Sequence, residues 1–194
     1  VAQIISYEVP LGLSILAIVI FTQTLDLQEM CLQQSIFTEN IKLFSLIDIN
    51  VSKSGFLAWN IIQFPFAVLL LVIYFISTLA ESNRAPFDLP EADAELIAGI
   101  QTEYGGFRWS VIMLGEYSMM FLTGMLGSVL FFGGWATPLP NIGTLELALW
   151  TTGTMGELSG YIWGIFWTLS KVFAWIFVQM WVRWTYPRLR IDQL

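Results

Sequence analysis

The chain has 194 residues, 56% of them hydrophobic and 12% charged, where soluble chains carry roughly 25% charged residues. This composition excludes a soluble domain, and a net charge of −7 disfavours nucleic-acid binding, which needs clusters of Lys and Arg. The chain contains no His and a single Cys, Cys31. These counts exclude a disulfide framework within the chain and an iron–sulfur cluster held by this chain alone.

Four apolar stretches have about the 20 residues that a helix needs to cross a bilayer. They cover residues 4–25, 56–80, 109–134 and 161–184, and Pro65 predicts a kink in the second. We therefore expect an all-α integral membrane protein with about four transmembrane helices in a single polytopic domain, residues 1–194.

Three polar loops separate these stretches, at residues 26–55, 81–108 and 135–160. Basic residues favour the cytoplasmic or matrix side of a membrane. The second loop contains Arg84 and Arg108, and three more arginines follow or end the fourth stretch, whereas the other side has only Lys42 and Lys53. The second loop and the basic tail are therefore expected to face the cytoplasm or matrix.

Three charged residues fall at membrane depth, where a charge needs a partner, a water-filled cavity or neutralisation. Glu8 lies near the start of the first stretch, Glu116 about 10 Å into the third, and Lys171 near the middle of the fourth. Glu116 could be a carboxyl held protonated by burial, and Lys171 a structural counter-charge to an acid on a neighbouring helix. Three such charges in four stretches favour a proton or ion pathway instead.

The second loop holds the densest charge in the chain. Its capping-box pattern, Asp88 followed by Glu91, predicts a short helix from about Leu89 to Ala98, which places Glu91 and Glu95 on one face. Apolar residues are interleaved with the acids, so we expect the loop to lie under a partner protein. Its negative potential suits protons or a cationic patch. The six acids of this loop are Glu81, Asp88, Glu91, Asp93, Glu95 and Glu103.

Five segments, in order along the whole chain, resemble a known family. Residues 81–91 (Glu-Ser-Asn-Arg-Ala-Pro-Phe-Asp-Leu-Pro-Glu), continuing through residues 95–99 and 102–104, look like the signature loop of NADH dehydrogenase subunit 1, the membrane subunit of respiratory complex I that is called the H subunit in bacteria. The other four segments are residues 2–8 (Ala-Gln-Ile-Ile-Ser-Tyr-Glu), 115–117 (Gly-Glu-Tyr), 131–135 (Phe-Phe-Gly-Gly-Trp) and 181–194 (from Trp-Val-Arg to Asp-Gln-Leu).

The family is about half as long again as this chain, with roughly eight spans. We therefore expect a fragment that resembles the middle-to-C-terminal part, or one product of a split gene. Asp93 stands where many members have Glu, and Ile191 where they have Tyr.

The resemblance implies a role for each group of charges. It places Glu8, Glu116 and Lys171 on a proton route, and it assigns docking of the peripheral arm to Arg183, Arg188, Arg190 and Asp192. The quinone chamber and the coupling loop would include Glu81, Arg84, Asp88, Glu91, Asp93, Glu95, Glu103 and Tyr104.

The same resemblance implies an enzyme complex, the proton-translocating NADH:ubiquinone oxidoreductase, whose redox centres lie on other subunits. Ubiquinone would be a substrate of the complex, and NADH, FMN and iron–sulfur clusters would bind partner subunits, with no metal on this chain. The partners expected are quinone-site subunits of the peripheral arm, antiporter-like membrane subunits, a chain supplying the missing N-terminal spans, and lipids. The expected location is an energy-transducing membrane, with the mitochondrial inner membrane preferred over the bacterial plasma membrane.

Three alternatives remain at this point. An ion channel or transporter would line a substrate path with the buried charges, although the chain lacks the internal repeat that many transporters show. A purely structural anchor of a membrane complex would need the charges only for assembly. The homologous membrane subunit of a membrane-bound hydrogenase shares the architecture, but the long acidic loop favours the quinone-linked type.

Overall fold

The fold is a bundle of apolar helices, seen here in a computed structural model that describes residues 2–35, 41–43, 47–49, 55–84, 86–87, 106–140, 147–153 and 156–187. Among the described residues, three helices are long and apolar enough to cross a membrane: α1 (Ala2–Thr22), α7 (Phe107–Phe132) and α9 (Leu158–Thr185). They lie close to the first, third and fourth predicted stretches. The expected count of four spans is therefore met only in part.

The second predicted stretch is divided into three pieces. A 3-10 turn, η2 (Gly55–Ala58), is followed by α3 (Asn60–Gln63) and then by α4 (Ala67–Glu81), whose 15 residues fall short of a full span. Phe64, directly before Pro65, is extended with φ −113° and ψ 122°, as the ring of a following proline requires. The expectation of one kinked helix was wrong, because Pro65 breaks the helix completely.

Two predicted loops contain secondary structure. The first holds α2 (Leu27–Gln33), which begins where the Asp26 side chain accepts a hydrogen bond from the backbone N–H of Gln28 at 2.9 Å. It also holds an antiparallel hairpin of β1 (Ile41–Leu43) and β2 (Ile47–Ile49), with Ile41 opposite Ile49. The third loop contains α8 (Leu147–Thr152). The described fold is predominantly helical, as the expected all-α class requires, and the hairpin is a short addition that the sequence did not predict.

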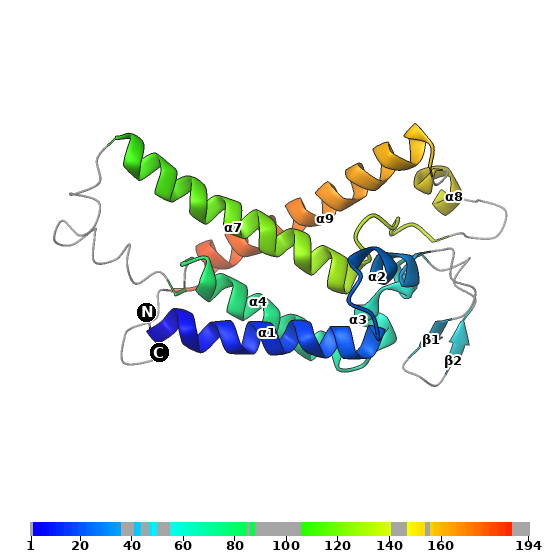
Figure 1. The fold of residues 1–194 in the computed structure, drawn as a ribbon, viewed down its shortest axis with the longest axis horizontal. Helices are drawn as coiled ribbons and strands as arrows, with labels where there is room; N and C mark the ends of the chain where they lie inside the picture. Colours follow the sequence, from blue (N-terminus) through cyan, green and yellow to red (C-terminus); the bar gives the residue numbers. More distant parts are fainter. Residues whose placement is uncertain are drawn as a thin grey trace.

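The helices form two packed pairs (Figure 1). α1 lies along α4, and α7 crosses α9. Where the pairs meet, a core of apolar side chains surrounds Tyr74, whose hydroxyl donates a hydrogen bond to the carbonyl of Thr123 at 2.8 Å. Gly127 allows this close approach, since a Cβ there would lie 3.0 Å from the Tyr74 ring. The buried core residues are Ile18, Met30, Ala67, Tyr74, Leu130, Phe131 and Trp175.

The bundle has two distinct ends (Figure 1). α1 begins, α4 ends and α9 ends at one of them, whereas α2, α8 and the hairpin lie at the other. At the first end Tyr7 and Phe87 place their ring centres 5.0 Å apart, and Val182 packs against Leu79 and Ala80. Most of the predicted site residues that the structure describes lie at this end.

Candidate functional site

Arg84 is brought under α7 by the turn that ends α4. The hydroxyl of Ser82 donates to the carbonyl of Thr78 at 2.8 Å, and Asn83 takes a left-handed conformation with φ 48°. The chain then reverses, and the backbone N–H of Arg84 donates to the carbonyl of Leu79 at 3.1 Å. This reversal turns the Arg84 side chain back into the bundle, where only 8% of it is exposed.

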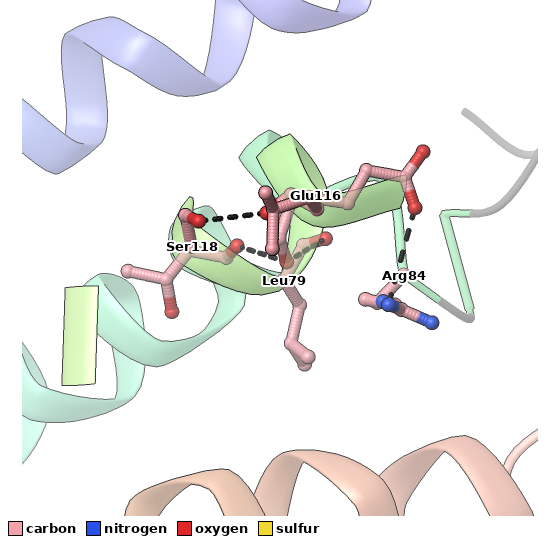
Figure 2. A network of polar contacts seen from close by, with 7 residues as sticks. Leu79, Arg84, Glu116 and Ser118 are labelled. Atoms are coloured by element: carbon pink, nitrogen blue, oxygen red, sulfur yellow. Dashed lines mark hydrogen bonds and ion pairs between the residues drawn. The ribbon is translucent and has the colours of Figure 1, made fainter. Parts of the chain in front are cut away.

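Arg84 meets Glu116 on α7 (Figure 2). Nη2 of Arg84 lies 3.9 Å from Oε2 of Glu116, and the guanidinium carbon lies 4.5 Å from the centre of the Tyr117 ring. Among the described residues, Nε and Nη2 of Arg84 make no hydrogen bond. Arg84 is therefore held by charge attraction to Glu116 and by the Tyr117 ring. The distance from Nη2 to Oε2 is longer than that of a charge-assisted hydrogen bond.

Glu8 and Glu81 form a second charged group at the same end. α1 lies along α4, and Glu81 is the last residue of α4, one position beyond the predicted span. Burial raises the pKa of the Glu81 carboxyl, and the charge of Glu8 raises it further. Two carboxylates that share a partly buried site ionise less readily together than apart, so the charge on one affects proton binding by the other.

The structure thus gathers four of the predicted residues at one end of the bundle, and we refer to them as the charged cluster: Glu8, Glu81, Arg84 and Glu116. Arg183, in the last turn of α9, lies at this end as well. Electrostatic interactions are stronger in a medium of low dielectric constant than in water. A change in the charge of the Glu116 carboxyl would therefore alter the electrostatic energy of the other groups in the charged cluster.

Lys171 is not part of this cluster. Its ammonium donates to the carbonyls of Phe132, Gly134 and Ala136 at 2.7, 2.8 and 2.6 Å. Phe132 lies about 24 Å along α7 from Glu116, at 1.5 Å per residue. Among the described residues Lys171 therefore contacts the end of a helix and is too distant to be a direct counter-charge of Glu116.

The remaining predicted residues lie outside the part of the chain that the structure describes. They include most of the acidic loop, its expected helix at residues 89–98, and the basic tail. The residues are Asp88, Glu91, Asp93, Glu95, Glu103, Tyr104, Arg188, Arg190 and Asp192.

Two buried amides at the far end were missed by the sequence analysis. Nε2 of Gln34 donates to the carbonyl of Val129 at 3.0 Å, and Nδ2 of Asn60 donates to the carbonyl of Leu130 at 2.8 Å. Oε1 of Gln34 also accepts from the backbone N–H of Asn60 at 3.1 Å. A polar Asn within an apolar stretch was the available signal, since a buried amide needs partners.

A half-open cavity of about 640 Å³ lies at this far end, between α2, α8 and the first half of α9. Its lining is largely apolar, with a few hydroxyl and amide groups. Trp135 and Thr137 form one wall, and Gly160, Gly164 and Thr168 of α9 form another.

Comparison with known proteins gives consistent matches over the whole chain. Residues 1–194 match the family described as NADH dehydrogenase. The chain is similar to the NADH-quinone oxidoreductase H subunit 2 of Cytophaga hutchinsonii, with 54% identity over all of this chain and 55% of the relative. It is also similar to the NADH-quinone oxidoreductase H subunits of Chlorobaculum tepidum and of Chlorobaculum parvum, at 47% and 46% identity, over all of this chain and 48% of each relative.

The chain spans about half the length of these curated relatives. All three come from bacteria, so they give no support to the expected preference for a mitochondrial membrane.

Proposed function

The chain belongs to the NADH dehydrogenase family, and from this we propose that it is a membrane subunit of a proton-translocating NADH:quinone oxidoreductase. In this proposal it helps form the chamber where quinone is reduced, and it couples that reduction to proton movement through its intramembrane acids. The bacterial relatives favour the plasma membrane as its location. Its partners are the other subunits of complex I.

The contact between Arg84 and Glu116 carries this proposal. It joins the turn that opens the acidic loop to a carboxylate on an apolar helix, across 3.9 Å. A change of charge in the loop therefore has a short electrostatic path into the membrane helices. Glu81 and Glu8 give a second path of the same kind, because the charge of Glu8 raises the pKa of Glu81.

The proposed mechanism is electrostatic. Quinone receives two electrons from a neighbouring subunit and develops negative charge, which favours protonation of nearby carboxylates. Protonation of carboxylates in the acidic loop changes the electrostatic potential at Arg84, and the attraction between Arg84 and Glu116 then changes. Glu116 and Glu8 respond by taking up or releasing a proton, which is passed to the adjoining membrane subunits.

The electron chemistry belongs to the partners in this proposal. The chain has no His, and its one Cys is buried at 1% exposure, so its residues do not fit an iron–sulfur cluster. NADH, FMN and the clusters are assigned to the peripheral subunits. Quinone is a substrate that this chain helps to enclose.

The test replaces Glu116 by Gln in the assembled complex. We expect quinone-linked proton translocation to fall several-fold, because Gln keeps the shape of the side chain and cannot carry the charge. NADH oxidation by an artificial acceptor, which bypasses quinone, should stay at the wild-type rate.

The matched control is Glu29→Gln, an exposed acid on α2 at the opposite end of the bundle. Its side chain accepts a hydrogen bond from Thr24, which Gln can also accept, so quinone-linked pumping should be unchanged. Wild-type pumping in the Glu116→Gln complex would overturn the assignment of Glu116.

A further inference from the structure

The carboxyl end of α7 is held by side chains from three other segments. The last carbonyls of a helix have no donor within the helix and must find one elsewhere. Here Gln34, the residue that follows α2, donates to the carbonyl of Val129, and Asn60 of α3 donates to the carbonyl of Leu130. α9 supplies Lys171, whose ammonium reaches three further carbonyls.

Each N–H donor of the Lys171 ammonium has a carbonyl acceptor. The ammonium has three N–H donors, and the carbonyls of Phe132, Gly134 and Ala136 accept from it at 2.6–2.8 Å. Its nitrogen also lies 5.1 Å from the centre of the Trp59 ring, which attracts a cation. A positive charge at this position is attracted to the partial negative charge at the carboxyl end of a helix and stabilises it.

Two glycines form the turn that follows α7. Gly133 and Gly134 both have positive φ, 71° and 47°, and neither has a side chain to pack. Gly134 lies directly over Cys31, since a Cβ on Gly134 would fall 2.6 Å from the sulfur. The next residues, Trp135 to Thr137, form a wall of the half-open cavity.

We infer that Lys171 is a positioning residue whose ammonium caps α7 from a neighbouring helix and fixes the turn of residues 133–137. The role requires an ammonium with several N–H donors and involves no transfer of its proton. Without it, three carbonyls inside the bundle would lose their donor, and such groups are costly to bury unpaired. This inference goes beyond the proposed function, because its test measures the turn and does not depend on turnover.

Cys31 provides a built-in reporter of the turn. It is the only cysteine of the chain, it is 1% exposed, and burial raises the pKa of its thiol to about 11. Thiol alkylation needs the thiolate and physical access, so Cys31 should react slowly while the turn covers it. Opening of the turn should expose it.

The experiment measures maleimide labelling of Cys31 in the intact complex, read by mass spectrometry of this chain. Lys171→Met, which removes the charge and the donors, should raise the labelling rate about tenfold or more, because local opening becomes easier. Lys171→Arg keeps a charge and donors and should stay within about twofold of the wild type. Ser170→Met, an exposed neighbour on α9, is the matched control and should also stay within about twofold.

Two results would overturn the inference. One is wild-type protection of Cys31 in Lys171→Met or, where that variant does not assemble, in Lys171→Gln. The other is a Lys171→Arg complex that keeps Cys31 protected but loses proton translocation, since Lys171 would then act through its proton. Assembly of Lys171→Arg together with failure of both neutral variants supports the positioning role, because assembly needs no proton transfer.

Discussion

Nη2 of Arg84 lies 3.9 Å from Oε2 of Glu116, so the turn after α4 is tied to a carboxylate on α7. We expect Arg84→Met and Glu116→Gln to be coupled in a double-mutant cycle. The coupling free energy should be about 1–2 kcal/mol, below that of a fully buried pair because Glu116 is 29% exposed and the contact is long. Amide hydrogen exchange of residues 79–84 in the assembled complex measures it as a local opening free energy.

The same cycle with Arg84→Met and Ser118→Ala is the control. Ser118 lies on α7 near Glu116, but its hydroxyl donates to the carbonyl of Leu114 within the helix (Figure 2). The two changes should be additive within about 0.5 kcal/mol. If the effects of Arg84→Met and Glu116→Gln on the opening free energy were also additive, the two side chains would be close together without stabilising the turn.

The pKa of Glu81 predicts a defined pH dependence. Burial and the charge of Glu8 raise this pKa, so the folded state binds a proton more readily than the unfolded state does. The stability that this group contributes is complete below the ordinary carboxyl pKa and is lost as pH rises through the raised value. Glu81→Gln should therefore be more stable than the wild type at neutral pH, and the difference should vanish in acid.

Thermal inactivation of the complex, measured across pH in both proteins, checks this sign. Glu8→Gln should act in the same direction, because it removes the second cause of the shift. A Glu81→Gln complex that is less stable than the wild type at neutral pH would contradict the assignment.

The positions of the long helices could be predicted because bilayer thickness sets their length. α1, α7 and α9 follow directly from runs of about 20 apolar residues. Pro65 correctly marked the weak point of the second stretch, but hydropathy alone does not distinguish a kink from a complete break. The short α2 and α8, and the hairpin, were missed because each depends on local turns and tertiary contacts more than on periodicity.

The charged residues could be found from the sequence, but their partners could not. Glu116 and Arg84 stood out, yet their meeting depends on the left-handed turn at Asn83. Lys171 was expected beside an acid, as a buried cation usually is. Its described partners are carbonyl oxygens, which every residue has, so no sequence pattern could indicate them.

Gly127 allows α7 to approach Tyr74, and we expect Gly127→Leu to force these helices apart. A Cβ there would lie 3.0 Å from Cε1 of Tyr74, so a larger side chain also disrupts the hydrogen bond from Tyr74 to Thr123. The cost should be about 1–3 kcal/mol, as for other overpacked cores. Gly115→Leu is the control on the same helix, where no atom lies within 4 Å of an added Cβ.

Hydrogen exchange of residues 120–127 in the assembled complex measures this effect. Gly127→Leu should lower protection there, while Gly115→Leu should leave it unchanged or slightly increased, because Leu favours a helix more than Gly does. Equal protection in the two variants would mean that the close contact at Gly127 is dispensable.

Gln34 joins α2, α3 and α7, and we expect its loss to destabilise the far end of the bundle. Its amide donates to the carbonyls of Met30 and Val129, and its carbonyl accepts from the backbone N–H of Asn60. Gln34→Leu fills the same space and leaves these groups without their partner, at a cost of about 2–4 kcal/mol. Gln28→Leu, on the exposed part of α2, should cost less than about 0.5 kcal/mol.

Hydrogen exchange at residues 128–134 distinguishes the two variants. Gln34→Leu should reduce protection at the end of α7, and it should also increase labelling of Cys31, because the sulfur lies under the turn at Gly134. Loss of protection at the end of α7 without any change at Cys31 would mean that the Lys171 cap alone holds the turn. In that case Gln34 stabilises only the helix end, and the three donors act independently.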